Sequence, residues 1–311
     1  MEKPDQILEL VQPIRDDLLS GAAEIALRAI TIFQTVMAEK ECEDASVMKE
    51  RLIKTARALI SAQPAMAPLF HLGNSVLTAI KEGSDSAQMQ KDVQDALDRT
   101  EKQLCESAAL IADHVYDFVP PGEMVFAYSF SSTVVSALLS ARAKGRYFRV
   151  CCTEARPSLE GRKLAAQLAS GGIEVIHTFD NAMGLILPNC SVAFMGCDCI
   201  GPPGVVNKVG SWTLAVSCRE LKVPLYALAG TEKFVTEDWL FEFEKYERPG
   251  AEVWDAAPKG VRVLNQQFEL IPFNLITALV TEKGVLKEQH VNDYVGRLTV
   301  HDALKLEAAS F

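Results

Sequence analysis

Between residues 124 and 230, short apolar runs alternate with longer segments of helical periodicity, and this alternation constrains the fold more than any other feature. The apolar runs have the length of strands, and most of the segments between them have ten or more residues with helical periodicity. Strands that alternate with helices in this way are typical of a parallel sheet covered by helices. The sequence therefore predicts an α/β protein with a doubly wound, Rossmann-like sheet.

The residues before this region have a different pattern. Apolar side chains recur there at three- and four-residue steps, and residues 84–119 have the pattern of one long amphipathic helix. The turn signal Pro120-Pro121-Gly122 marks the change to strands. A chain of 311 residues favours two domains. We predict a helical domain over residues 1–118 and a Rossmann-like α/β ligand-binding domain over residues 119–311.

The last part of the chain has weaker signals. Residues 231–260 are polar, carry several charge clusters and have no clear period, which predicts loops. Residues 268–286 are expected to form a turn, a helix and a short strand, followed by a helical tail.

The charge balance narrows the choice of partners. The formal net charge of −10 disfavours broad adhesion to nucleic acid or to an anionic membrane, because both attract basic surfaces. We therefore expect neither as a direct partner. The start of the chain lacks the pattern of a signal peptide, and no run is apolar enough to span a membrane, so we expect a cytoplasmic protein.

The eight cysteines are expected to be reduced and structural. Several lie in apolar, strand-like runs, and residues two apart in a strand share one face, so Cys197 and Cys199 can both simply pack. No second pair or histidine cluster lies at zinc-finger spacing. We predict no metal site and no cofactor.

In an open parallel sheet, ligands bind outside the carboxyl ends of the strands. After the first strand, Ser129 and Ser131 begin a hydroxyl-rich turn that could hold a phosphate, although Ser131 is equally suited to cap the next helix. After the second strand, Arg156 could grip a phosphate and Glu154 could fix its guanidinium or accept sugar hydroxyls. A surface ion pair is the alternative there.

The next two strand ends carry carboxylates. Asp180 could accept a ribose hydroxyl or cap the following helix, and the sequence does not decide between these roles. Asp198 follows a strongly apolar strand, where burial would raise its pKa and suit it to proton transfer. The alternative for Asp198 is a hydrogen bond within a loop.

Two further segments could bring cations to the same edge. Residues 201–211 are expected to form a glycine-rich loop that enters a helix, and there Asn207 offers a donor and an acceptor while Lys208 supplies a positive charge. Lys233 follows the fifth strand. The segment is neither a GxGxxG motif nor a Walker loop, so it does not identify the ligand by itself.

Several of these segments together resemble one known family. They are TEARPSLEGRKLAAQLASGGIEV, GCDCIGPPGVVNKVGSWTLA and VPLYALAGTEKF. The family contains the alpha, beta and delta regulatory subunits of eukaryotic translation initiation factor 2B with their archaeal relatives, and also methylthioribose-1-phosphate isomerase and ribose-1,5-bisphosphate isomerase. The resemblance is dense from about Met124 to Phe234, and LIPFNLITALVTEKGVL resembles the C-terminal segment of the family.

The resemblance implies roles for individual residues. In the isomerases, a cysteine after the first strand and an aspartate after the fourth form the catalytic pair. Asp198 matches that aspartate, but Ser129 stands at the cysteine position, as in the members that resemble translation factors. The isomerases also carry Arg-Gly-Ala at an N-terminal phosphate-binding turn, where this chain has Ser20-Gly21-Ala22.

These departures favour binding over turnover. The matched positions that remain to bind a sugar phosphate are Arg156, Asn207 and Lys208. Gly21 and Lys233 are two further candidates for this binding. We predict a regulatory or sensing protein that binds a sugar phosphate or a nucleoside monophosphate. An aldose–ketose isomerase of a sugar 1-phosphate is the alternative, and a scaffold without a ligand is the third possibility. The resemblance further implies a homodimer or a higher homo-oligomer, with a translation factor as a possible partner.

Overall fold

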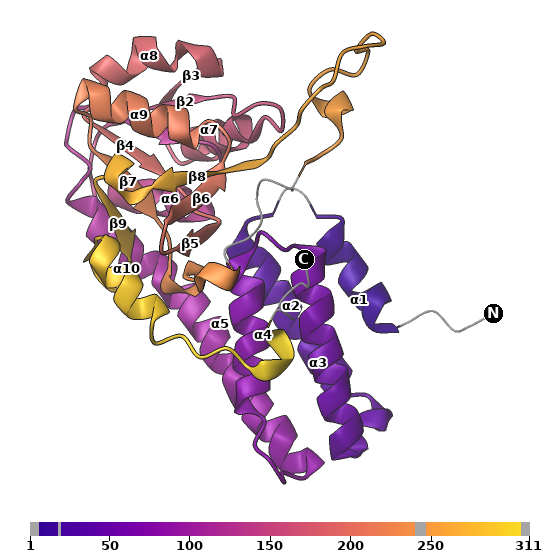
Figure 1. Cartoon of the computed structure of the whole chain (residues 1–311). Helices are drawn as coiled ribbons and strands as arrows, with labels where there is room; N and C mark the ends of the chain where they lie inside the picture. Colours follow the sequence, from indigo (N-terminus) through magenta and orange to yellow (C-terminus); the bar gives the residue numbers. More distant parts are fainter. Residues whose placement is uncertain (1–5, 18–19, 240–246, 306–311) are drawn as a thin grey trace. The chain divides into compact units, whose positions relative to one another are not determined.

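The computed structural model describes residues 6–17, 20–239 and 247–305, except for the side chain at position 238. Parts of the predicted loop (240–246) and of the predicted tail (306–311) therefore lie outside the described residues. The chain divides into two compact units: residues 1–106 with 297–311 form a helical unit, and residues 107–296 form a sheet unit. The mixed α/β architecture with a mostly parallel central sheet confirms the predicted fold class (Figure 1).

The helical unit is built from amphipathic helices whose apolar faces pack together. Buried side chains recur at helical spacing in these helices, for example Ile25, Ala29 and Phe33 in α2 and Leu52, Ala56 and Leu59 in α3. The helices of this unit are α1 (Gln6–Arg15), α2 (Ala22–Met37), α3 (Ala45–Ala62), α4 (Ala67–Ala79) and the first part of α5 (Ser86–Tyr116). The long helix predicted over residues 84–119 therefore forms as α5.

The boundaries of the units differ from those of the predicted domains at two places. Residues 107–118, which include the end of α5, belong to the sheet unit. Residues 297–305 belong to the helical unit, although they lie in the predicted sheet domain. Asn74 of α4 explains this, because its side chain donates to the carbonyl of Thr299 (2.8 Å) and accepts from the backbone N–H of His301 (2.8 Å). Arg57 of α3 donates to the carbonyl of Ala303 (2.9 Å). Side-chain contacts over more than 200 residues of sequence leave no periodic pattern that sequence reasoning could find.

The sheet unit contains a seven-stranded sheet in the order β10-β9-β7-β4-β1-β2-β3. All pairings are parallel except the one between β9 and β10. The strands are β1 (Met124–Tyr128), β2 (Arg149–Thr153), β3 (Glu174–Thr178), β4 (Val192–Met195), β7 (Leu225–Leu228), β9 (Ala278–Thr281) and β10 (Gly284–Leu286). The chain order reverses between β1 and β4, so these two strands form the topological switch point of the sheet.

Helices cover both faces of this sheet, and alternate residues of each strand pack against one side or the other. Val125 and Ala127 belong to the hydrophobic cluster that includes α6 and α7, whereas Phe126 and Tyr128 belong to the cluster with α8 and α9. The helices are α6 (Ser132–Ala143), α7 (Glu160–Ser170), α8 (Met183–Ile186), α9 (Ser211–Leu221) and α10 (Glu288–Val295).

The two neighbouring cysteines of β2 follow the same alternation. Cys151 packs on one face of the sheet and Cys152 on the other. All eight cysteines are free thiols, and only Cys105 is exposed. Among the described residues, no group of three His, Cys, Asp or Glu side chains could hold a metal ion, and no helix is long and apolar enough to cross a membrane.

A second, three-stranded antiparallel sheet corrects two predictions. It consists of β5 (Cys199–Gly201), β6 (Gly204–Lys208) and β8 (Phe268–Pro272). The glycine-rich loop predicted over residues 201–211 is wrong, because Pro202 and Pro203 form only the tight turn of a hairpin. The helix predicted within residues 268–286 is also wrong. That segment forms β8, a short turn, β9 and β10, since its backbone pairs with β6 and β7.

Candidate functional site

Two of the predicted residues lie at the switch point of the sheet. Ser129 follows β1, and Asp198 follows β4, which pairs with β1. Ser129 has a positive φ of 58°, an unusual conformation for a residue other than glycine that turns the chain sharply from β1 towards α6. Its buried hydroxyl donates to Oε2 of Glu160 over 2.7 Å.

Glu160, at the start of α7, is the centre of a polar cluster that also contains Ser129, Ser158 and Lys208. The sequence analysis did not select Glu160 as a site residue. Its Oε1 atom lies 3.2 Å from the hydroxyl of Ser158 and 3.2 Å from Nζ of Lys208. The next residue makes this position possible, because a Cβ atom on Gly161 would lie 1.7 Å from the carbonyl oxygen of Thr153. Glycine thus lets α7 approach the end of β2 closely enough to present Glu160.

Lys208, the last residue of β6, brings a buried cation to the cluster. Its Nζ atom donates to Glu160 and, over 2.7 Å, to Oε1 of Gln267. The amide of Asn207 donates to the hydroxyl of Ser211 (2.8 Å), which donates in turn to the carbonyl of Lys208 (2.7 Å). Asn207 therefore supports the start of α9 and the position of Lys208. Gln267 is a second residue that the sequence analysis missed.

Asp198 is half-buried, and desolvation raises the pKa of its carboxyl group to about 6. The charge of Lys233 opposes this pKa shift, Glu160 increases it and Lys208 opposes it. The three charged neighbours that act on Asp198 thus belong to the same region of the sheet unit. A carboxyl group with this pKa exchanges its proton close to neutral pH, which suits either acid–base chemistry or a pH-dependent contact.

Lys233 holds the chain next to Asp198. It lies in a short turn after β7, and its buried Nζ atom donates to the carbonyl of Cys197. This contact commits one of its three donors to the protein itself. Burial raises the pKa of the Cys197 thiol to about 12, so this cysteine stays protonated at neutral pH and is poorly suited to replace a catalytic thiolate.

Arg156 is exposed on the loop between β2 and α7, the same loop that ends at Glu160. Asp180 fixes this loop, because its carboxylate accepts from the backbone N–H groups of Ala155 (2.8 Å) and Arg156 (2.9 Å). Within the described part of the chain, the guanidinium of Arg156 has no hydrogen-bond or ion-pair partner. Glu154 pairs instead with Arg162. The predicted contact of Glu154 with the Arg156 guanidinium is therefore absent among the described residues.

Ser131 has the capping role that was the alternative to phosphate binding. Its Oγ atom accepts from the backbone N–H of Val134 at 3.4 Å. A Cβ atom on Gly196 would lie 2.6 Å from Cβ of Ser131, so the start of α6 contacts the segment that leads to Asp198. Ser131 therefore belongs to the same neighbourhood, and its capping contact leaves the nearby backbone N–H groups at the start of α6 as possible anion donors.

The start of α9 is an anion-binding position that the protein fills itself. Oε1 of Glu269 accepts from the backbone N–H groups of Gly210 and Trp212, both at 2.7 Å. Gly210 has a φ of 105°, and a Cβ atom there would lie 1.9 Å from the hydroxyl of Tyr128. The glycine allows β6 to turn tightly into α9, and the carboxylate of Glu269 takes the place that a phosphate could otherwise occupy.

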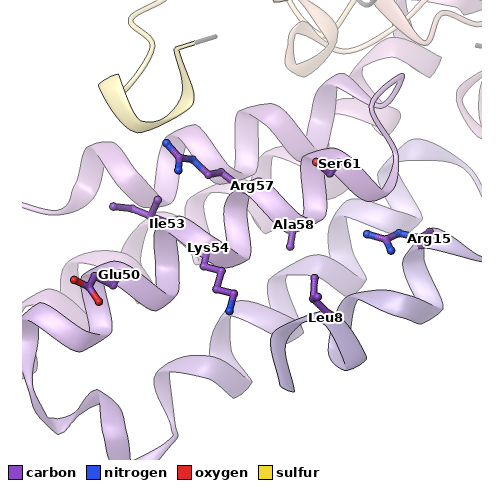
Figure 2. Close-up of a pocket in the computed structure, with 8 residues that line it drawn as sticks. All are labelled: Leu8, Arg15, Glu50, Ile53, Lys54, Arg57, Ala58 and Ser61. Atoms are coloured by element: carbon purple, nitrogen blue, oxygen red, sulfur yellow. The ribbon is translucent and has the colours of Figure 1, made fainter. Parts of the chain in front are cut away.

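Gly21 is the one predicted site residue that lies in the helical unit, where it caps α2 with an extended backbone. The same unit contains a pocket of about 480 Å³ between α1 and α3. Figure 2 shows Arg15, Lys54 and Arg57 around it, with Leu8 and Ile53 among the apolar side chains. None of the predicted site residues lines this pocket.

The chain is similar to known proteins over most of its length. The model of the initiation factor 2 subunit family matches residues 18–288. The chain belongs to this family. It is 28% identical, over 91% of its length and 97% of the relative's, to the putative translation initiation factor eIF-2B subunit 2-like protein of Pyrococcus furiosus. It is 25% identical, over 93% of its length and 94% of the relative's, to the ribose 1,5-bisphosphate isomerase of Methanocaldococcus jannaschii.

A solved structure agrees with these similarities. The crystal structure of the translation initiation factor eIF-2B of Pyrococcus horikoshii matches 92% of this chain and 98% of that protein, with a TM-score of 0.75 and 26% identity. The relatives of this chain thus include both a protein named as a putative translation initiation factor and one named as a sugar-phosphate isomerase. The resemblance found in the sequence is confirmed.

Proposed function

We propose that this member of the family binds a sugar phosphate or a nucleoside monophosphate at the carboxyl ends of β1, β2 and β4, in a regulatory or sensing role. The phosphate is held by Arg156, whose guanidinium is exposed and unpaired within the described part of the chain, and by Lys208. Arginine suits this role because two of its N–H groups can bind one phosphate together. The hydroxyl of the sugar faces Asp198 and Asn207.

The observation that carries the proposal is the hydrogen bond from Ser129 to Glu160. The isomerases that this chain resembles have a cysteine at the position of Ser129. A thiol ionises near pH 8.5, whereas a serine hydroxyl requires a strong base to become a nucleophile or a proton acceptor. The buried hydroxyl of Ser129 is already committed to a carboxylate. This arrangement supports binding without isomerisation.

The second candidate function is an aldose–ketose isomerase, and the pKa of Asp198 favours it. A carboxyl group with a pKa of about 6 can accept and return a proton at neutral pH, which the transfer of hydrogen between neighbouring carbons requires. Cys197 does not strengthen this candidate, because its buried thiol has a pKa of about 12. The isomerase would depend on Asp198 with Ser129 and Glu160.

One experiment separates the two functions. The purified protein is incubated with ribose 1,5-bisphosphate or with methylthioribose 1-phosphate, and the formation of ketose is followed by NMR. The proposal predicts saturable binding without product. Ketose formation that the substitution Asp198→Asn abolishes would establish the isomerase and contradict the regulatory role.

Association is a further part of the proposal. We expect a homodimer or a larger homo-oligomer, as the resemblance implies, with a translation factor as a candidate partner of the regulatory role. We expect it in the cytoplasm, as the pattern of the sequence predicts. Light scattering coupled to size-exclusion chromatography measures the mass directly. A single species of 34.1 kDa would contradict the expected association.

A further inference from the structure

Residues 247–266 form an extended segment that the proposed function does not explain. Figure 1 shows this segment, coloured orange, leading away from the β5-β6-β8 sheet before the chain returns as β8. Residues Glu247 and Gln266 pair in antiparallel fashion at its base. Beyond that base the segment exposes large apolar side chains, namely those of Val253, Trp254, Val261 and Leu264. We call residues 247–266 the arm.

A chain of side-chain hydrogen bonds fastens the base of the arm from inside. The side chain of Asn265 is buried and donates to the carbonyl of Pro249 (2.9 Å) and to Oε2 of Glu252 (3.1 Å). Glu252 also accepts from Arg248 at 2.9 Å. The buried amide of Gln267 donates to Oδ1 of Asn265 over 2.6 Å. The two chain segments at the base of the arm are thus held together by Asn265.

The same chain of contacts continues into the candidate site. Gln267 accepts, through its Oε1 atom, from Nζ of Lys208 (2.7 Å), and Lys208 also donates to Glu160 (3.2 Å). The side-chain oxygen of Gln267 therefore accepts a hydrogen bond from the site residue Lys208, and its side-chain nitrogen donates one to the arm residue Asn265. Because both ends of this buried amide are engaged, it cannot rotate without leaving a polar group unpaired. Lys208 and the arm are consequently linked through the amide of one residue.

We propose that anion binding at Lys208 is coupled to the arm through Gln267 and Asn265, so that the arm responds to the ligand and the arm's base in turn sets the affinity of the site. The inference rests on the proposed binding of a phosphate at Lys208. A phosphate there competes with Glu160 for the ammonium group and draws it towards the ligand. Gln267 follows the ammonium group or loses its hydrogen bond, and either change alters the support of Asn265.

Linkage makes the effect reciprocal. If the ligand changes the free energy of the arm's attachment, a change at the attachment alters the affinity for the ligand by the same factor. Asn265 makes no hydrogen bond to the ligand-binding side chains of the proposal, so its effect on affinity would have to pass through Gln267. A substitution of Asn265 therefore distinguishes coupling through Gln267 from a direct contact with the ligand.

Hydrogen exchange on the full chain tests the inference, with ribose 5-phosphate as the ligand and calorimetry to measure its binding in parallel. Saturating ligand is expected to change the exchange rate of peptides that cover residues 247–266 at least twofold. In Asn265→Ala this response disappears while calorimetric binding persists, with the affinity changed about threefold or more. Glu252→Ala, an exposed position with a smaller folding risk, gives the same loss. Val261→Ala, on the arm but outside the chain of contacts, keeps the wild-type response.

The outcomes are distinct. Calorimetric binding without any change in the exchange of the arm overturns the coupling and leaves the proposed function intact. A response that survives in both Asn265→Ala and Glu252→Ala overturns the route through Gln267 and Asn265. Absence of calorimetric binding for ribose 5-phosphate contradicts the coupling together with the phosphate site on which it rests.

Discussion

The Nζ atom of Lys208 lies 3.2 Å from Oε1 of Glu160, so the buried cation of the candidate site faces a carboxylate that the chain supplies itself. Oε2 of the same carboxylate accepts a hydrogen bond from the hydroxyl of Ser129. A ligand phosphate near Lys208 would have to share this cation with Glu160. Glu160 therefore acts as a built-in competitor, and its charge lowers the affinity of the site for anions.

Replacing Glu160 by glutamine tests this relationship. A glutamine oxygen can still accept from Ser129, but the negative charge is gone, so we expect Glu160→Gln to raise the affinity for ribose 5-phosphate about fivefold, which corresponds to roughly 1 kcal/mol. Calorimetric titration measures the affinity. The matched control is Glu174→Gln, an equal change of charge at the exposed amino end of β3. An unchanged or weaker affinity in Glu160→Gln would contradict the competitor role.

Asp198 predicts a specific dependence of stability on pH. Its folded pKa of about 6 lies above the ordinary value of 3.8, so the folded state binds the proton more tightly than the unfolded state does. Stability from this group is complete below about pH 4 and decreases as the pH rises to about 6. Asp198→Asn removes this loss, and we expect the variant to be more stable than the wild type by about 1–3 kcal/mol at pH 7.5.

Urea unfolding at several pH values measures this difference. The advantage of Asp198→Asn should shrink towards zero at pH 4, where the carboxyl group is protonated in both states. Asp255→Asn, an exposed carboxylate on the arm, is the matched control, with equal stability to the wild type at both pH values. A variant that is less stable than the wild type at pH 7.5 would show that ionised Asp198 is stabilised by its cations instead.

Gly161 lets α7 pack closely against the end of β2, and this packing places the neighbouring residue Glu160. A Cβ atom there would overlap the carbonyl of Thr153, so Gly161→Ala is expected to destabilise the protein by about 3 kcal/mol through overpacking. Gly184→Ala is the control, because nothing lies within 4 Å of an added Cβ atom at that helical position. Urea unfolding followed by circular dichroism compares the two variants. Equal stabilities would mean that α7 can move away from β2 at little cost.

The sequence was informative where local patterns determine the structure. Alternating apolar runs and helices indicate the direction of parallel strands, and from this the sequence predicts that Ser129 and Asp198 lie at one edge of the sheet. The same logic did not identify Glu160, which lies seven residues beyond the end of β2. Its position depends on the close packing of Gly161 against the carbonyl of Thr153. Gln267 reaches Lys208 across 59 residues of sequence through the pairing of β6 with β8.

The second sheet was missed for a related reason. Glycine and proline between positions 201 and 204 indicate a loop, and the turn they form is real. The strands on either side are short, and their regularity depends on the partner strand β8, which lies about 60 residues further along the chain. Pairing between distant segments is a tertiary effect that the periodicity of a single segment does not contain.

Calorimetric titration of the wild type and of Arg156→Ala with ribose 5-phosphate, at fixed salt and pH, tests the central claim most directly. The account predicts saturable binding by the wild type and an affinity at least tenfold lower in Arg156→Ala, because a guanidinium–phosphate contact contributes about 1.5–3 kcal/mol. Arg162→Ala, which removes a neighbouring arginine that is paired with Glu154, should keep the wild-type affinity. An affinity that is the same in Arg156→Ala and in the wild type would contradict the proposed anion site.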